Sequence, residues 1–308
     1  MASETYFVTG ATGLLGEALV PVLRARAPDA VLRLLVRGKR PWSDPHIDYV
    51  DGELCDEEAL RRGAAGADAI VHLAALSHAR TREAYWQVNV GGTGRLLAAA
   101  RAAGTPRFVF VSSRYADPSC GAYGASKREA EQQVCGSGVP YVIVRFGELY
   151  GWQSVRGLEQ LVRGVRRLPC VPYPNLPATF APLSTAEAAD VLARLVTDRS
   201  VNNRRYALTG PVTYTIRELL EVIACALGVR RLLVPVPAAV ITLIHRAGRA
   251  MGLPLDEDMI SRLVGRKDDD ISAARRELGF EPVPFDQGAR TYFRGPPPSG
   301  GNGVRGAV

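Results

Sequence analysis

Tyr123 and Lys127 stand four residues apart in the stretch Tyr-Gly-Ala-Ser-Lys. This spacing places both side chains on one face of a helix. A tyrosine phenol has a pKa of about 10 in water, so it exchanges protons poorly near neutral pH. A neighbouring ammonium group favours the phenolate and lowers the pKa of the phenol. The pair therefore predicts a proton-transfer group, Tyr123, which Lys127 makes more acidic.

A serine precedes this pair at the end of an apolar run. The run Arg107–Ser112 is rich in branched residues, which predicts a buried strand, and Ser113 follows it directly. Ser113 stands ten residues before Tyr123, so we expect its hydroxyl to hold a reacting oxygen beside the phenol; Ser112 is the alternative. Lysine is scarce, with 3 among 308 residues, so Lys127 beside this tyrosine favours a chemical role over an ordinary surface pair.

The first apolar run of the chain, Tyr6–Thr9, leads into a glycine-rich turn with glycines at 10, 13 and 16. A turn without side chains lets backbone N–H groups and a helix N-terminus approach a pyrophosphate, and the last glycine lets the helix pack closely on the strand. The turn therefore predicts a dinucleotide site, and its candidate contacts are Gly10, Thr12, Gly13, Leu14, Leu15 and Gly16. The nicotinamide of such a cofactor is positively charged when oxidised, which would also favour the Tyr123 phenolate.

The residue that follows the second apolar run, Val31–Val36, is basic. An acidic residue here would accept hydrogen bonds from the adenosine ribose hydroxyls of NAD. Arg37 can only donate, and its planar guanidinium suits a 2′-phosphate. We therefore expect NADP(H) to be favoured, with NAD(H) possible. The alternative is that Arg37 is a solvated loop residue of an arginine-rich chain.

Short apolar runs alternate with segments of helical spacing in the first half of the chain. One helix follows the glycine turn, with Pro21 expected to bend it, and another ends at Gly104. The runs expected as strands are Tyr6–Thr9, Val31–Val36, Ala69–Leu73, Arg107–Ser112 and Tyr141–Phe146. The alternation predicts an α/β fold of the Rossmann type, with a doubly wound parallel sheet.

The pattern changes after Gly151. Five prolines indicate an irregular loop at Leu168–Pro182, and Thr215 with Glu218 has the spacing of a capping box. Helices are expected at Thr185–Thr197, Ile216–Leu227, Ala238–Met251, Asp256–Val264 and Ile271–Leu278. We therefore divide the chain into a nucleotide-binding core at 1–167, a smaller and mostly helical substrate lobe at 168–294, and a disordered tail at 295–308. Segments of the lobe can return to the core.

The net charge of +7 comes from 35 arginines and 3 lysines scattered along the chain, with no basic block that would indicate a nucleic-acid partner. The five cysteines are widely spaced, so we expect reduced thiols and no metal site. The N-terminus lacks the regions of a signal peptide, and the apolar run Leu232–Ile244 is too short to cross a bilayer. These features predict a soluble cytoplasmic protein with a small-molecule substrate, no nucleic-acid partner and no membrane partner.

Two further groups of residues are interpreted as structural. His72 falls in a predicted buried strand, where a packing role is favoured over metal binding. Asp268, Asp269 and Asp270 are expected to form a solvated loop or an N-cap before the last helix.

The glycine turn and the Ser113, Tyr123 and Lys127 pattern resemble the short-chain dehydrogenase/reductase superfamily, in its extended or atypical branch related to NAD-dependent epimerase/dehydratases. Four further stretches are similar to motifs of that family, at Gly52–Asp56, Val71–Ala75, Asn89–Thr93 and Arg145–Gly151. The short gap before Tyr123 and the stretch Arg114–Ser119 are similar to the atypical branch. The resemblance implies that Ser113, Tyr123 and Lys127 form a catalytic triad.

The resemblance also implies cofactor contacts beyond the glycine turn and Arg37. Those residues are Glu53, Leu54, Leu73, Ala74, Ala75, Asn89, Tyr123, Lys127, Phe146, Gly147 and Leu149. Proteins of this family are commonly dimers, so a homodimer is possible.

Three functions remain open at this point. The first is an NADP(H)- or NAD(H)-dependent oxidoreductase that interconverts a carbonyl and an alcohol. The second is a nucleotide-sugar epimerase or dehydratase that retains NAD through an oxidation–reduction cycle. The third is a catalytically silent cofactor-binding sensor or structural subunit, against which the intact Ser113, Tyr123 and Lys127 set argues. The sequence does not identify the substrate.

Overall fold

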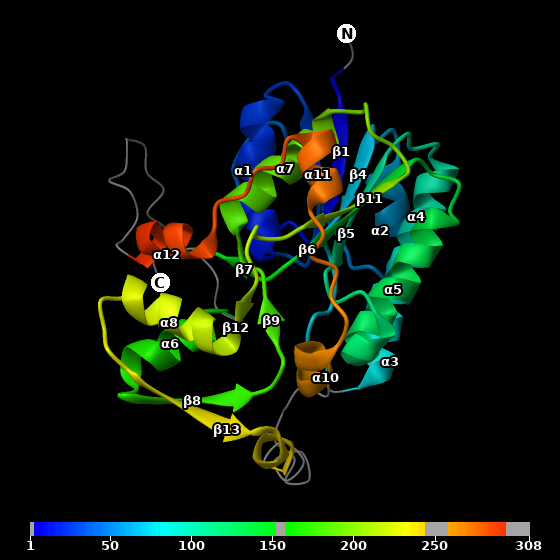
Figure 1. Cartoon of the computed structure of the whole chain (residues 1–308). Helices are drawn as coiled ribbons and strands as arrows, with labels where there is room; N and C mark the ends of the chain where they lie inside the picture. Colours follow the sequence, from blue (N-terminus) through cyan, green and yellow to red (C-terminus); the bar gives the residue numbers. More distant parts are fainter. Residues whose placement is uncertain (1–2, 80, 152–157, 244–257, 294–308) are drawn as a thin grey trace.

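The computed structural model describes residues 3–79, 81–151, 158–243 and 258–293. The five apolar runs form parallel strands of one sheet, within a residue of the predicted bounds (Figure 1). These strands are β1 (Thr5–Thr9), β2 (Val31–Val36), β4 (Ala69–His72), β5 (Phe108–Ser113) and β6 (Tyr141–Phe146). Two strands that the sequence did not predict, β3 (Ile47–Asp51) and β11 (Arg204–Leu208), complete the edges.

The seven strands follow the order β11-β6-β5-β4-β1-β2-β3, and each neighbouring pair is parallel. The chain runs from β1 outward through β2 and β3, and then returns to the opposite side of β1 as β4. The strand order therefore reverses between β1 and β4. In open α/β sheets ligands bind in the crevice beyond the carboxyl ends of the strands at such a switch point.

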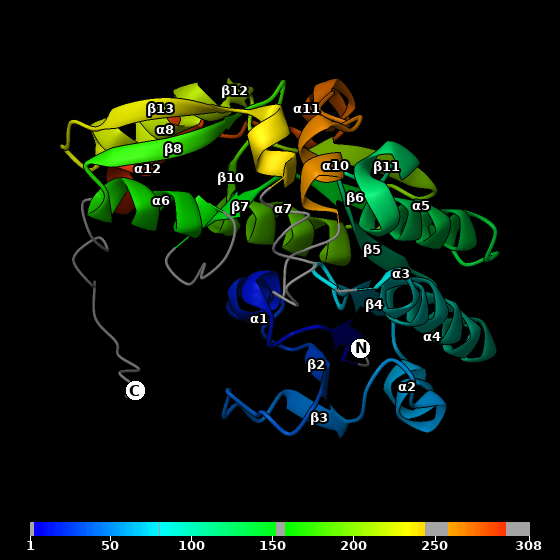
Figure 2. The ribbon, with the colours of Figure 1, turned by 90° about the horizontal axis from the view of Figure 1, so that it is seen from below.

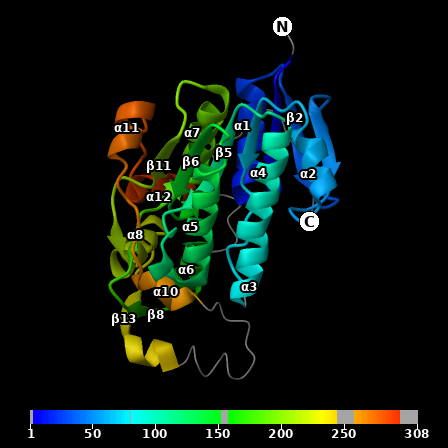
Figure 3. The ribbon, with the colours of Figure 1, turned by 90° about the vertical axis from the view of Figure 1, so that its right-hand side faces the viewer.

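Helices cover both faces of the sheet, which confirms the doubly wound fold. One face carries α1 (Leu14–Arg26), α7 (Thr185–Thr197) and α11 (Ser272–Leu278), which bury one apolar cluster against the strands. The other face carries α2 (Glu57–Ala64), α4 (Gly92–Ala102) and α5 (Gly121–Cys135), over a second cluster (Figure 3). The short helix α3 (Arg82–Tyr85) and a π-helical turn at Trp86–Gly91 lead into α4.

A smaller lobe lies to one side of the sheet (Figure 2). It has its own apolar cluster, built on helices α6 (Leu158–Arg167), α8 (Ile216–Ala226) and α12 (Phe285–Phe293). Its strands are two pairs, β8 (Cys170–Asn175) with β13 (Leu232–Pro237), and β9 (Thr179–Phe180) with β12 (Tyr214–Thr215). A further pair, β7 (Leu149–Tyr150) with β10 (Leu183–Ser184), joins the lobe to the core.

The irregular loop predicted at Leu168–Pro182 is wrong in part, because β8 and β9 fall within it. The signal for the loop was its prolines, and two of them, Pro172 and Pro174, lie inside β8. Proline removes one backbone donor, but a two-stranded pair leaves one edge of each strand without a partner, where no donor is required. Parallel pairing with β13 therefore tolerates a density of prolines that a central strand would exclude.

The capping boxes predict helix starts well. Thr215 and Glu218 form the predicted box at α8, and Ser184 with Glu187 forms another at α7, which spans the predicted Thr185–Thr197. The helix predicted at Ile271–Leu278 is α11, which begins one residue later, at Ser272. Gly279 follows it and has a left-handed backbone conformation. α1 runs through Pro21 without a break in the helix.

Several segments of the chain depart from the predicted division at 167/168. α7, β11 and α11 return to the sheet, as allowed, and α6 packs in the cluster of the smaller lobe although it was placed in the core. Of the predicted helix Ala238–Met251, residues 238–243 are helical and the rest lie outside the described residues. The predicted helix Asp256–Val264 is described from 258 as α10 (Met259–Val264), and the tail at 295–308 lies outside the described residues. Within the described ranges, no helix is long and apolar enough to span a membrane.

Candidate active site

The glycine-rich turn lies at the switch point between β1 and β4. Gly10 has φ of 76°, a left-handed conformation that favours glycine, and a Cβ there would lie 2.6 Å from the backbone nitrogen of Ala74. Gly16 lets α1 pack closely on the turn, because a Cβ added at this position would lie only 2.4 Å from the carbonyl oxygens of Gly10 and Ala11. The predicted residues Leu73, Ala74 and Ala75 follow β4 and therefore lie beside this turn.

Gly13 differs from its two neighbours because it faces open space. It is exposed, and a Cβ there would approach only the carbonyl oxygen of Gly10, at 3.3 Å. Gly13 is also the N-cap of α1 and has no side chain that could satisfy the first N–H groups of that helix. An N-terminus with free donors, approached by a surface without side chains, is suited to a pyrophosphate. The turn therefore has the shape and donors that a dinucleotide requires.

Ser113 and Tyr123 lie together at the carboxyl end of β5. The Ser113 hydroxyl lies near enough to the Tyr123 phenol to lower its pKa, and Ser113 is almost fully buried. The alternative serine, Ser112, is engaged elsewhere, because its hydroxyl donates to Glu131 Oε1 at 2.6 Å. The geometry therefore favours Ser113 as the partner of the phenol.

Lys127 is buried on the same helix but its ammonium group is directed into the core. Its Nζ donates to the carbonyl oxygen of Val111 at 2.8 Å and lies 4.3 Å from the ring centroid of Phe110. Burial lowers the pKa of Lys127 to about 8. Lys127 therefore holds α5 on β5, as well as lying one turn from Tyr123.

The expectation that Lys127 makes Tyr123 acidic is not met in this structure. Burial is the largest effect on the Tyr123 phenol and raises its pKa above the ordinary value. Two groups oppose that increase, the hydrogen bond from Ser113 and the positive charge of Arg262. Sequence spacing predicted the neighbour of Tyr123 along the helix, but the direction of the lysine side chain depends on the strand beneath it.

Asn89 connects the loop after β4 with the helix that carries Tyr123. Its Oδ1 accepts from the backbone nitrogen of Leu76 at 2.8 Å, and its Nδ2 donates to the Leu76 carbonyl oxygen and to Ser126 Oγ, both at 3.0 Å. Ser126 in turn donates to the carbonyl oxygen of Tyr123 at 2.7 Å. Asn89, predicted as a cofactor contact, is therefore positioned to fix the loop and α5 relative to each other.

Arg37, Glu53 and Leu54 lie at the far side of the turn, after β2 and β3. Arg37 is exposed, and within the described part of the chain it forms no ion pair or hydrogen bond. Its basic neighbours are engaged, Lys39 with Glu17 at 2.9 Å and Arg40 with Asp51. Leu54 packs on Gly92, where a Cβ would lie 2.9 Å from the Leu54 Cβ. Arg37 is therefore available to a ligand.

Phe146, Gly147 and Leu149 follow β6. Phe146 is buried, and its carbonyl oxygen accepts from the backbone nitrogen of Arg114 at 2.9 Å. A Cβ at Gly147 would lie 2.6 Å from the carbonyl oxygen of Ala181, so this glycine is needed for close packing of the chain itself. The structure places these residues at the same edge of the sheet as Ser113.

His72 is fully buried at the end of β4, as expected for a packing residue. Its Nδ1 lies 2.7 Å from Thr9 Oγ1 and its Nε2 lies 3.0 Å from Thr93 Oγ1. Burial, and to a smaller degree the charge of Lys127, lowers the pKa of His72 to about 3. The imidazole is therefore neutral and joins the glycine turn to α4.

Asp258 and Arg262, which the sequence did not single out, complete the surroundings of Tyr123. Asp258 is buried, and its carboxylate accepts from the backbone nitrogens of Ala122 at 2.9 Å and of Tyr123 at 2.6 Å. The Arg262 guanidinium lies 5.3 Å from the centroid of the Tyr123 ring. Asp258 precedes α10 and Arg262 lies in it. Both are more than 130 positions from Tyr123 in the sequence, so no local motif connects them with α5.

The solvated loop expected at Asp268–Asp270 is wrong for its first two residues. Asp268 pairs with Arg145 at 3.0 Å and Asp269 with Arg114 at 2.5 Å, because β5 and β6 each end in a buried guanidinium that requires a carboxylate. Asp270 accepts from the backbone nitrogen of Ser272 at 2.9 Å, as an N-cap before α11 would.

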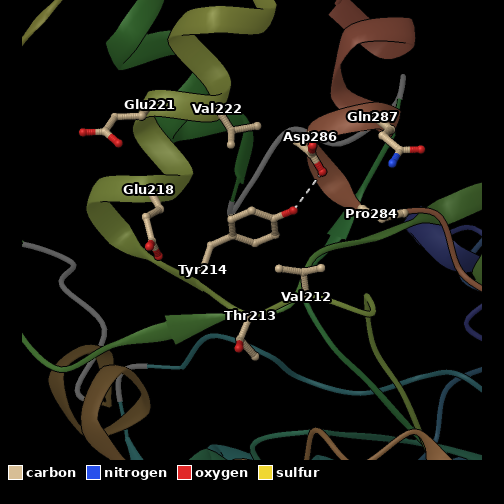
Figure 4. A pocket seen from close by; sticks show the side chains of 9 residues that line it. All are labelled: Val212, Thr213, Tyr214, Glu218, Glu221, Val222, Pro284, Asp286 and Gln287. Atoms are coloured by element: carbon tan, nitrogen blue, oxygen red, sulfur yellow. Dashed lines mark hydrogen bonds between the residues drawn. The ribbon is translucent and has the colours of Figure 1, made fainter.

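A surface hollow of about 540 Å³ lies apart from these residues, between β12, α8 and α12 (Figure 4). Its carboxylates have partners within the chain. Asp286 accepts from the Tyr214 hydroxyl at 3.1 Å, Glu218 caps α8, and Glu221 pairs with Arg217 at 2.9 Å. The hollow contains none of the predicted site residues, so the switch point remains the candidate active site.

The chain is similar to known proteins in sequence and in fold. The model of the NAD dependent epimerase/dehydratase family matches residues 6–167. Ceramide reductase of Caulobacter vibrioides (strain NA1000 / CB15N) is 40% identical over 190 residues, which cover 59% of this chain and 57% of that protein. A 4-hydroxy-2-methyl-3-oxo-4-farnesyl-3,4-dihydroquinoline-1-oxide ketoreductase of Stigmatella aurantiaca is 30% identical over 312 residues, which cover 89% of this chain and 91% of that protein.

A solved structure shares the fold. A dTDP-glucose 4,6-dehydratase from Streptomyces venezuelae, with NAD bound, superimposes with a TM-score of 0.75 over 94% of this chain and 96% of that one, at 23% identity.

Proposed function

The chain belongs to the NAD dependent epimerase/dehydratase family of enzymes, and from that premise we propose that it is an NADP(H)-dependent reductase that converts a carbonyl to an alcohol. The resemblance to the extended branch of the short-chain dehydrogenase/reductase superfamily is thereby confirmed. The observation that carries the proposal is the placement of the buried Ser113 beside the Tyr123 phenol, at the sheet edge where the glycine turn opens.

Each residue of the site has a separate task in this proposal. A bound nicotinamide would supply the hydride for the carbonyl carbon. Ser113 would hold the carbonyl oxygen, and Tyr123 would give that oxygen its proton. Burial keeps the pKa of Tyr123 above its ordinary value, so the phenol retains its proton near neutral pH, as a donor must. Asn89 and Lys127 hold α5 and the loop after β4 in place.

The named relatives favour a ketone that carries a long apolar group. Ceramide and a farnesyl-bearing quinoline oxide are both lipophilic. Exposed apolar side chains lie on and after β13, with Leu232 at 66%, Val240 at 42% and Leu243 at 68% exposure. A surface of this kind suits an apolar ligand or partner. We therefore propose lipophilic ketones as the substrate class.

A direct test is a screen of carbonyl compounds with NADPH and NADH, followed by the absorbance of the reduced nicotinamide. Long-chain 3-keto compounds and prenylated quinolones would stand beside short ketones of the same headgroup. We expect turnover that needs added NADPH and improves with chain length. If sugar nucleotides are instead converted without added cofactor, the protein is an epimerase or dehydratase that retains NAD, and the reductase proposal is wrong.

Arg37 should determine the choice of cofactor. An exposed guanidinium without an acidic partner at the end of β2 can grip a 2′-phosphate, which NADPH has and NADH lacks. We expect Arg37→Ala to weaken NADPH binding by about 10- to 100-fold and to leave NADH binding unchanged. Arg33→Ala is the control, because among the described residues Arg33 bonds to backbone carbonyls at the C-terminal end of α2. Equal affinities for NADPH before and after Arg37→Ala would refute the role.

A further inference from the structure

Asp258 caps the N-terminus of the helix that carries Tyr123. α5 has no side-chain cap of its own, since Cys120 occupies the N-cap position without such a bond. The Asp258 carboxylate instead accepts from the first free N–H groups of α5, at Ala122 and Tyr123. It fits closely, because a Cβ at Gly121 would lie 2.3 Å from Asp258 Oδ1. α10 is therefore fixed against the start of α5 (Figure 1).

Arg262, one turn after Asp258, is held over the phenol by this arrangement. Its guanidinium lies 5.3 Å from the centre of the Tyr123 ring, within the range of a cation–π interaction. Its Nη1 donates to the carbonyl oxygen of Ser77 at 2.8 Å, in the loop that follows β4. Arg262 thus lies between the loop beside the glycine turn and the ring of Tyr123.

Among the described residues, the other groups that lie against Tyr123 are a hydroxyl, a neutral ring and a carboxylate. β5 contributes the Ser113 hydroxyl, and α3 contributes the neutral ring of Tyr85, with centroids 5.8 Å apart. Asp258 is negative and bonds to the backbone of Tyr123, not to its phenol. On α5 itself, the Lys127 ammonium is directed to Val111 and Phe110. Arg262 is therefore the cation in contact with the phenol among the described residues.

We propose that Arg262 is a positioning residue for the proton transfer, one that stabilises the phenolate of Tyr123 from the side of the smaller lobe. The proposal rests on the role of Tyr123 in the proposed function. An ionised ring carries more negative charge than a neutral one, so a guanidinium over it favours the phenolate. A single charge at this distance, in a partly solvated site, changes a pKa by about one unit.

The experiment measures the Tyr123 phenol directly and requires no substrate. The 11 tyrosines are replaced by 3-fluorotyrosine, because fluorine gives each phenol a ¹⁹F resonance and lowers its pKa toward neutral pH. The ¹⁹F resonance that disappears in Tyr123→Phe identifies the residue. We expect Arg262→Gln to move its titration midpoint upward by about one pH unit, and Arg262→Lys to move it by less.

Two controls decide what a result means. Arg266→Gln removes the same charge from an exposed position in the same segment, and should leave the midpoint unchanged. If Arg262→Gln fails to fold, Arg262→Met keeps the apolar stem over the ring and takes its place. An unchanged midpoint in the folded neutral variant overturns the role of Arg262 and leaves the reductase proposal intact. Full activity of Tyr123→Phe would overturn the role of Tyr123 as the proton donor, on which this inference rests, whatever the titration shows.

Discussion

Replacing Tyr123 with phenylalanine should lower the rate of carbonyl reduction by about 10²- to 10⁴-fold, the usual contribution of a positioned proton donor. The substitution removes one oxygen atom and leaves the ring against Tyr85 and Arg262. Binding of the dinucleotide at the glycine turn should persist, because none of the turn contacts involves this hydroxyl. The measurement is kcat and kcat/KM for NADPH oxidation with the best ketone from the screen, together with NADPH affinity.

The pH dependence should separate the two directions of the reaction. Because burial raises the pKa of Tyr123, the phenol stays protonated through neutral pH, and reduction should decline only as the pH rises through that raised value. Oxidation of the alcohol requires the phenolate, so its rate should increase with pH over the same range. Tyr123→Phe should show neither the fall of the reduction rate nor the rise of the oxidation rate with pH.

A matched control is available beside this residue. Tyr85 is a buried tyrosine in ring contact with Tyr123, and within the described part of the chain its hydroxyl accepts from the backbone nitrogen of Ala79, at 2.9 Å. Tyr85→Phe should therefore cost little activity. If Tyr123→Phe is no worse than Tyr85→Phe, Tyr123 is not the proton donor. If the unmodified chain converts no carbonyl compound in the screen, the silent-sensor interpretation gains.

The parts of the fold that could be predicted are those that local sequence specifies. Branched apolar runs gave the five central strands, and the capping box of Thr215 with Glu218 gave the start of α8. The edge strand β3 has only five residues, and only Ile47 and Val50 among them are buried, so its sequence shows neither an apolar run nor an alternating pattern. β8 was not predicted because its prolines indicated a loop. Its pairing with a single partner strand tolerates those prolines.

The candidate site divides in the same way. Glycine spacing placed Gly10 and Gly16 at positions where a Cβ would meet backbone atoms, and the resemblance placed Asn89 at the loop it fixes. The choice between Ser112 and Ser113 required the structure, because two successive residues of a strand point to opposite faces of the sheet. The direction of the Lys127 side chain and the position of Arg262 beside the Tyr123 ring depend on tertiary packing. Neither residue spacing nor a local motif specifies them.

Replacing Glu131 with alanine should strongly destabilise the fold, because Glu131 is a buried carboxylate on α5. Glu131 is buried, and it accepts from Arg145 Nε at 2.7 Å, from Arg145 Nη2 at 2.6 Å and from the Ser112 hydroxyl. Its removal leaves a guanidinium of low exposure with only one carboxylate, Asp268. Breaking a buried pair in this way costs about 3–5 kcal/mol, a large part of the stability of a typical domain.

Urea unfolding followed by far-UV circular dichroism would measure this loss, with Glu129→Ala as the matched control. Glu129 is an exposed glutamate two residues earlier on the same helix, so the two variants have the same helix propensity and net charge and differ only in burial. We expect Glu129→Ala to change the free energy of unfolding by less than about 0.5 kcal/mol. Equal losses in the two variants would contradict a buried ion pair at Glu131.

Because Glu131 connects α5 to β5 through Ser112 and to β6 through Arg145, its loss should also loosen the helix that carries Tyr123. We therefore expect reductase activity in Glu131→Ala to be lost at lower urea concentrations than in Glu129→Ala.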